Sequence, residues 1–128
     1  MALRCLIVDD NDAFREGARD LLERQGLTVV GVAATSDEAL ERASVLRPDV
    51  TLVDIDLGEE NGFDLVRRLA GAAGLEHLHM VLISAYSESD FADLIASSPA
   101  IGFLSKAALS ASAIRELLDH GPSGRRDT

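Results

Sequence analysis

Five residues with acidic, hydroxyl or ammonium side chains follow short apolar runs of the sequence. Asp9 and Asp10 follow the first run, and Asp54, Ser84 and Lys106 follow later ones. If the three aspartates met at one site, their carboxylates would repel one another, and their proton affinities would rise unless positive charge lay among them. Such oxygen ligands suit a hard divalent cation, Mg²⁺ or Mn²⁺, and Lys106 would add further positive charge.

Residues of these types can together carry out phosphoryl transfer. A carboxylate can act as a nucleophile and form an aspartyl phosphate when a metal and a cation neutralise the oxygens of the transferring group. Asp54 is the candidate nucleophile, and Ser84 could donate its hydroxyl to one phosphoryl oxygen. The small side chain of Ala85 leaves space for phosphate to enter.

These residues can meet only if the apolar runs are neighbouring strands. The apolar period alternates between short β-rich runs and helical spacing, which predicts five strand–helix repeats. We expect strands at 3–8, 27–32, 49–53, 80–83 and 101–104, and helices at 12–25, 35–46, 62–69, 89–97 and around 114–118. Without two-residue hairpin turns, the strands should form a parallel sheet covered on both faces. The predicted fold class is α/β, a flavodoxin-like (βα)5 sandwich with a five-stranded parallel sheet in the order 2-1-3-4-5.

Local signals set some of the expected helix ends and faces. Gly26 stands where a C-terminal cap glycine belongs, and Thr35 with Glu38 three residues later resembles a capping box. In the predicted helix at 89–97, an apolar face that includes Leu94 should point inward.

Composition excludes several classes of function. The 128 residues carry a net charge of −10, which repels phosphate backbones and argues against direct nucleic acid binding. No apolar stretch approaches the roughly 18 residues that cross a bilayer, so we expect no membrane association. A single cysteine, Cys5, excludes an intramolecular disulfide and fits a cytoplasmic protein.

Taken together, these motifs resemble the receiver domain of two-component response regulators, the family that includes the chemotaxis regulator. The resemblance rests on Asp9 and Asp10 after an apolar strand, Asp54 with Gly62 eight residues later, Ser84 with Ala85, and the segment 103–106. It covers essentially the whole chain, with residues 1–120 as the receiver domain and 121–128 as a flexible C-terminal tail.

The resemblance implies a phosphoacceptor site. Asp54 would accept a phosphoryl group from a histidine kinase or a histidine phosphotransfer protein, and Ser84 and Lys106 would contact the phosphate. It also implies Mg²⁺ bound by Asp9 through water, by Asp10, by Asp54 and by the main-chain carbonyl of Asp56.

The resemblance further implies a switch instead of an enzyme that turns over external substrates. The domain would catalyse only its own phosphorylation and dephosphorylation. On phosphorylation the Ser84 hydroxyl would move toward the phosphate and the Phe103 ring would turn inward. The surface about residues 89–119 would then bind an output protein or a fused output domain, and a phosphorylation-dependent homodimer is compatible with this arrangement.

Four positions depart from the commonest pattern of the family. Ala107 follows Lys106 where proline is frequent, which argues against a cis peptide there and predicts looser placement of the lysine. Gly58 replaces the usual proline and predicts a more flexible loop at 57–61. Asp56 and Tyr86 flank the path of a hydrolytic water, so the lifetime of the phosphorylated form is not predictable from the sequence.

Two alternative functions compete with the switch. The Asp-x-Asp pair at 54 and 56 resembles the nucleophile and acid of haloacid-dehalogenase-type phosphatases, although there the motif follows the first strand. The second alternative is a degenerate module that binds partners without phosphate. The sequence also leaves open whether the chain is a free-standing regulator, a phosphorelay intermediate or the receiver of a longer protein.

Overall fold

The computed structural model describes residues 3–119, and a five-stranded parallel sheet forms its centre. The strand order is β2 (Thr28–Ala33), β1 (Arg4–Val8), β3 (Val50–Asp54), β6 (His79–Ser84) and β7 (Gly102–Ser105), and every neighbouring pair is parallel. The predicted α/β class and strand order 2-1-3-4-5 are therefore confirmed. The predicted tail at 121–128 lies outside the described residues.

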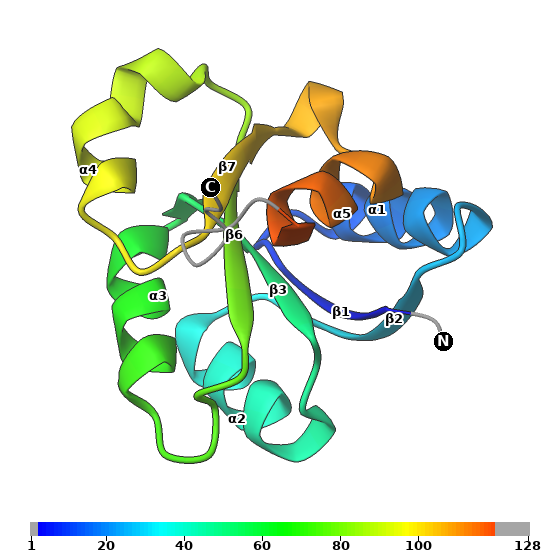
Figure 1. The fold of residues 1–128 in the computed structure, drawn as a ribbon, viewed down its shortest axis with the longest axis horizontal. Helices are drawn as coiled ribbons and strands as arrows, with labels where there is room; N and C mark the ends of the chain where they lie inside the picture. The colour runs from blue at the N-terminus through cyan, green and yellow to red at the C-terminus, as the bar shows by residue number, and fades with distance from the viewer. Residues whose placement is uncertain (1–2, 120–128) are drawn as a thin grey trace.

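Helices cover both faces of this sheet (Figure 1). Helices α1 (Asp12–Arg24) and α5 (Ala111–Asp119) pack on one face, and α2 (Ser36–Leu46), α3 (Gly62–Gly71) and α4 (Ala92–Ala96) lie on the other. Each strand sends alternate side chains into the two cores, as Ile7 and Val8 of β1 do. Burial on both faces explains why the strands read as nearly continuous apolar runs.

The segment after β3 forms a small hairpin. Strands β4 (Asp56–Leu57) and β5 (Glu60–Asn61) pair in antiparallel fashion around Gly58 and Glu59. Gly58 has φ of +75°, which proline cannot adopt because its ring fixes φ near −65°. The Glu60 carboxylate accepts the N–H of Ser36 at 2.8 Å and so ties the hairpin to the start of α2. The prediction that the chain has no two-residue hairpin turn is wrong, because strands of two residues show no alternation.

The predicted helix at 89–97 is divided into two short elements. A 3₁₀ turn, η1 (Glu88–Phe91), precedes α4, and Phe91 between them has φ −129° and ψ 16°. Phe91 and Ile95 pack against the core, but Leu94 is 47% exposed. The inward orientation predicted for Leu94 is therefore wrong, because a 3₁₀ turn has fewer residues per turn than the α-helix that sets the predicted spacing.

Two hydrogen bonds define the start of α2. The Thr35 hydroxyl accepts the N–H of Glu38 at 3.2 Å, as in the predicted capping box. The Glu38 carboxylate, however, accepts the N–H of Ala34 at 2.8 Å, one residue earlier than a standard box requires. The capping-box pattern therefore predicted the start of the helix correctly, but only one of the two hydrogen bonds of the box has the expected partners.

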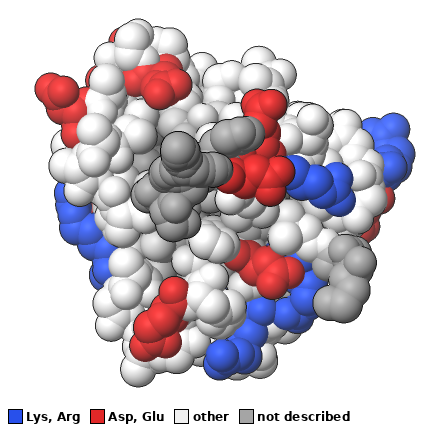
Figure 2. Space-filling view, in the orientation of Figure 1, with Lys and Arg blue, Asp and Glu red and all other residues white. Residues whose placement is uncertain are grey.

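Two properties of the described residues concern possible partners: the lengths of the helices and the distribution of surface charge. Across residues 3–119, every helix is too short or too polar to cross a bilayer. On the face shown in Figure 2, the described acidic and basic side chains lie in small separate groups.

Candidate functional site

Two neighbouring strands bring three acidic side chains together. Val8 of β1 pairs with Val53 of β3, so Asp9 and Asp54 follow at the same edge of the sheet. Asp9 is fully buried and Asp54 is 5% exposed, whereas Asp10 is exposed. One carboxylate oxygen from each of the three aspartates lies within 4.8 Å of the others. The structure thus gathers the acidic residues that the sequence analysis singled out.

Main-chain hydrogen bonds hold two of these carboxylates. The N–H of Asn11 donates to Oδ1 of Asp9 at 2.8 Å, and the N–H of Asp56 donates to Oδ1 of Asp54 at 3.1 Å. Asn11 also caps α1, because its side-chain oxygen accepts the N–H of Phe14 at 3.0 Å. Asp9 and the first turn of α1 are therefore linked through a single residue.

Lys106 supplies the positive charge at this edge. It begins the 3₁₀ turn η2 (Lys106–Ala108) directly after β7. Its Nζ lies 2.6 Å from Oδ2 of Asp9 and 3.2 Å from Oδ2 of Asp54, and the side chain is 20% exposed. No peptide bond within residues 3–119 is cis. The bond between Lys106 and Ala107 is therefore trans, as expected where alanine replaces the frequent proline. Two ion pairs, to Asp9 and Asp54, contact the ammonium of Lys106, and the looser placement expected for Lys106 stays a prediction.

The electrostatics of the cluster favour an added cation. The pKa of Asp54 is raised to about 6, mainly by burial; the Asp56 N–H and Lys106 act to lower it, and the charge of Asp9 acts to raise it. Burial acts to lower the pKa of Lys106, but hydrogen bonds and charges of Asp9 and Asp54 raise it overall. Three carboxylates and one ammonium leave two negative charges, which a divalent cation would balance. The oxygen-only donor set fits Mg²⁺ or Mn²⁺.

Two further predicted site residues, Ser84 and Phe103, lie on strands β6 and β7. Asp54 pairs with Ile83 in the sheet, so Ser84 ends the neighbouring strand one residue further along. Ser84 is 2% exposed, and its hydroxyl oxygen accepts the N–H of Tyr86 at 3.0 Å. Phe103 is 8% exposed, and its ring already lies inward, in the core on the face of the sheet that α2, α3 and α4 cover.

The Asp56 carboxylate accepts a hydrogen bond from the hairpin that follows β3. Its Oδ1 accepts the N–H of Gly58 at 3.1 Å, within the turn of the β4–β5 hairpin. The main-chain N–H of Asp56 donates to Asp54.

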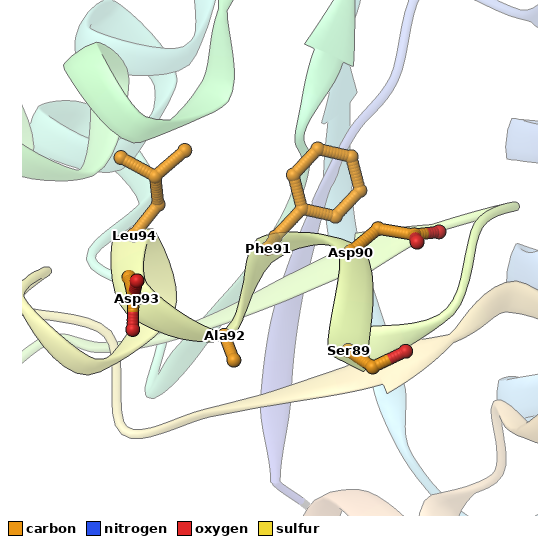
Figure 3. Close-up of a pocket in the computed structure, with 6 residues that line it drawn as sticks. All are labelled: Ser89, Asp90, Phe91, Ala92, Asp93 and Leu94. Carbon is orange, nitrogen blue, oxygen red and sulfur yellow. The ribbon is translucent and has the colours of Figure 1, made fainter.

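The hollow drawn in Figure 3 lies elsewhere. It is lined by residues 89–94 of η1 and α4, which include none of the predicted site residues. This hollow is therefore not the candidate site.

Phe14 is a member of the site that the sequence analysis did not identify. The Nζ of Lys106 lies 4.3 Å from the centroid of the Phe14 ring, within the range of a cation–π contact. The Phe14 ring also packs, partly buried, against the core on the α1 face of the sheet. The composition draws attention to the partner of Phe14, because Lys106 is the only lysine of the chain.

Comparison with protein families and curated relatives gives a consistent result. The family model described as the response regulator receiver domain matches residues 5–119. The response regulator GacA of Pseudomonas viridiflava is 33% identical over 107 residues, which are 83% of this chain and 49% of that protein. A protein-glutamate methylesterase/protein-glutamine glutaminase of Alkalilimnicola ehrlichii is 43% identical over 70 residues, which are 54% of this chain and 18% of that protein. The chain spans half or less of the length of these relatives.

Solved structures share the fold over nearly the whole chain. A two-component response regulator of the LuxR family from Aurantimonas sp. SI85-9A1 superposes with a TM-score of 0.82 at 28% identity, covering 100% of this chain and 90% of that one. The signal receiver domain of the putative response regulator NarL from Mycobacterium tuberculosis gives 0.78 at 28% identity, with 97% and 98% covered.

Proposed function

Because the chain belongs to the response regulator receiver domain family, we propose that Asp54 accepts a phosphoryl group from a phosphohistidine of a histidine kinase or a histidine phosphotransfer protein. A receiver is a regulatory domain of two-component signalling. The observation that carries the proposal is the Asp54 carboxylate itself. It ends a central strand, is nearly buried, contacts Lys106 and lies beside two further acids.

The proposed reaction is one displacement at phosphorus. An Asp54 carboxylate oxygen forms the new P–O bond while the P–N bond to the donor imidazole breaks, and the imidazole leaves with that electron pair and takes up a proton. Lys106 already lies 3.2 Å from Oδ2 of Asp54, and it would donate to a phosphoryl oxygen attached there. Ser84 keeps its hydroxyl hydrogen free to donate, because its oxygen accepts from Tyr86.

The proposed metal site uses residues of the same cluster. Asp10, Asp54 and the main-chain carbonyl of Asp56 would hold the ion directly, and Asp9 would hold it through water. When bound, Mg²⁺ or Mn²⁺ supplies neutralisation of the phosphoryl oxygens. The surplus negative charge of the cluster supports this assignment.

Phosphorylation would act on the rest of the molecule through Ser84 and Phe103. We propose that the Ser84 hydroxyl leaves the Tyr86 N–H for the phosphate, and that phosphorylation favours the inward position of the Phe103 ring. The surface about residues 89–119 would then engage an output protein, a fused output domain or a second copy of the chain. The relatives that are twice as long support a fused output domain, and the whole would act in the cytoplasm.

The phosphatase alternative has less support. In the Asp-x-Asp mechanism, the second aspartate protonates the leaving group. Here the Asp56 carboxylate accepts a hydrogen bond within its own hairpin turn, where it is exposed. We therefore expect stoichiometric labelling instead of turnover of an added phosphomonoester.

Intact-mass measurement tests the proposed function. The protein incubated with Mg²⁺ and acetyl phosphate should gain one phosphoryl group, which base removes. EDTA should prevent the gain, and the Asp54→Asn variant should show none because it lacks the nucleophile. Equal labelling of the wild type and Asp54→Asn would refute the assignment of Asp54. An unlabelled wild type that releases phosphate over many turnovers would point to the phosphatase.

Gly58→Ala should weaken metal binding. A Cβ at Gly58 would lie 3.0 Å from Oδ2 of Asp10, and its φ of +75° costs an L-residue about 1–2 kcal/mol. Displacement of the Asp10 carboxylate should raise the Kd for Mg²⁺ about tenfold in isothermal titration calorimetry. Gly71→Ala is the matched control, because a Cβ there meets nothing within 4 Å. Equal Kd values for both variants and the wild type would contradict the prediction.

A further inference from the structure

We propose that Phe14 is a positioning residue for Lys106, in that its ring face holds the ammonium over the phosphoacceptor edge through a cation–π contact. The inference rests on the proposed function, because the contact matters to the reaction only if Lys106 binds the phosphoryl group. It assigns a role in the site to a residue that otherwise reads as part of the apolar face of α1.

The ammonium of Lys106 is enclosed from three directions. Oδ2 of Asp9 lies 2.6 Å from Nζ, Oδ2 of Asp54 lies 3.2 Å from it, and the centroid of the Phe14 ring lies 4.3 Å from it. The lysine side chain is only 20% exposed, so the ring occupies a direction that water would otherwise take. A partly desolvated ammonium gains more from an aromatic face than an exposed one does.

The ring is itself held in place from the acidic cluster. Asn11 donates to Asp9 and accepts the N–H of Phe14, so the acid and the aromatic residue are fixed to one another through α1. Phe14 is half-buried and packs against the core between the sheet and α1 and α5. The main chain that carries the ring is therefore tied to the acidic cluster, whereas Lys106 comes from a distant part of the sequence.

The ring allows the ammonium to change partners during the reaction. Once a phosphoryl group is attached to Asp54, Lys106 must exchange part of its contact with the carboxylates for the new oxygens. The hydrogen bond that Lys106 donates to Asp54 is directional, but attraction to an aromatic face tolerates small rotations of the cation. Phe14 therefore keeps the ammonium near Asp54 while its hydrogen bonds are rearranged.

A fluorination series at position 14 tests the electrostatic part of this proposal. Phenylalanine with one, two or three ring fluorines, introduced at position 14 alone, weakens the negative ring face while nearly preserving its shape. The rate of phosphorylation by acetyl phosphate should fall stepwise with each fluorine, to a total of about three- to tenfold. The same analogues at Phe63, a core residue whose ring contacts Phe91, are the matched control and should leave the rate unchanged. A rate that is flat across the series at position 14 would overturn the proposal.

A second readout is independent of phosphorylation. Because Lys106 is the only lysine, isotope-labelled lysine gives a single ε-methylene NMR signal. Over the ring face, this signal should lie upfield in the metal-free protein and return toward the ordinary lysine position in Phe14→Leu, with Phe14→Tyr restoring the shift. An unshifted signal in the wild type overturns the contact. If the wild type takes up no phosphoryl group while the signal is shifted, the proposed function fails and the contact stands.

Discussion

Replacing Gly62 by alanine is expected to remove about 4 kcal/mol or more from the free energy of unfolding, enough to unfold a marginal domain. A Cβ at this position would overlap the carbonyl oxygen of Asp54 and would lie 2.8 Å from the Cα of Ile55. Both neighbours are main-chain atoms, and the N–H of Gly62 donates to the carbonyl of Ile55 at 2.8 Å. The start of α3 therefore cannot move away without displacing the end of β3.

Urea denaturation of Gly62→Ala measures this loss. Gly17→Ala is the control, because Gly17 lies inside α1 and a Cβ there meets nothing within 4 Å. Alanine at position 17 should raise stability by about 0.5–1 kcal/mol. If both variants shifted the unfolding midpoint by the same small amount, close packing at the end of β3 would not be the reason for glycine at position 62.

Replacing Asp54 by asparagine should stabilise the metal-free protein at neutral pH. Burial raises the pKa of Asp54 to about 6 from the ordinary value of 3.8. Below pH 3.8 the carboxyl is protonated in both the folded and the unfolded state and makes no difference to stability. Between 3.8 and 6 the folded state binds more protons, so stability falls as pH rises, and above pH 6 the full cost remains.

The gain is expected to be about 1–2 kcal/mol at pH 7.5 in EDTA, after allowance for solvent screening. It should disappear as the pH falls below 4. Asp20→Asn changes the same charge at an exposed position of α1 and should alter stability by less than about 0.5 kcal/mol. A wild type more stable than Asp54→Asn at pH 7.5 without metal would contradict the sign of this effect.

The position of the acidic cluster could be predicted because it depends only on the sheet. Parallel strands end at one edge, so Asp9, Asp54 and Ser84 had to lie on neighbouring strand ends once the apolar runs were recognised. Side-chain periodicity located the strands, and the strand order of the predicted fold class made their ends neighbours.

Features that depend on side-chain direction or on very short elements could not be predicted. The β4–β5 hairpin has two residues in each strand, too few to show a period. The exposure of Leu94 follows from a change of helix type at Phe91, which the apolar spacing does not encode. The contact of Phe14 with Lys106 joins opposite ends of the chain, and its partners read locally as a core residue and a surface charge.

The single lysine has a consequence for handling the protein. Reagents that acylate lysine side chains, including most activated esters used to attach dyes, biotin or solid supports, can react with this chain at only one side chain, Lys106. That ammonium is mostly enclosed, and its pKa is raised by Asp9 and Asp54 despite burial, so little free amine is available to react. Conjugation through lysine would consequently be slow, and each molecule that did couple there would carry the label in place of the charge beside Asp54.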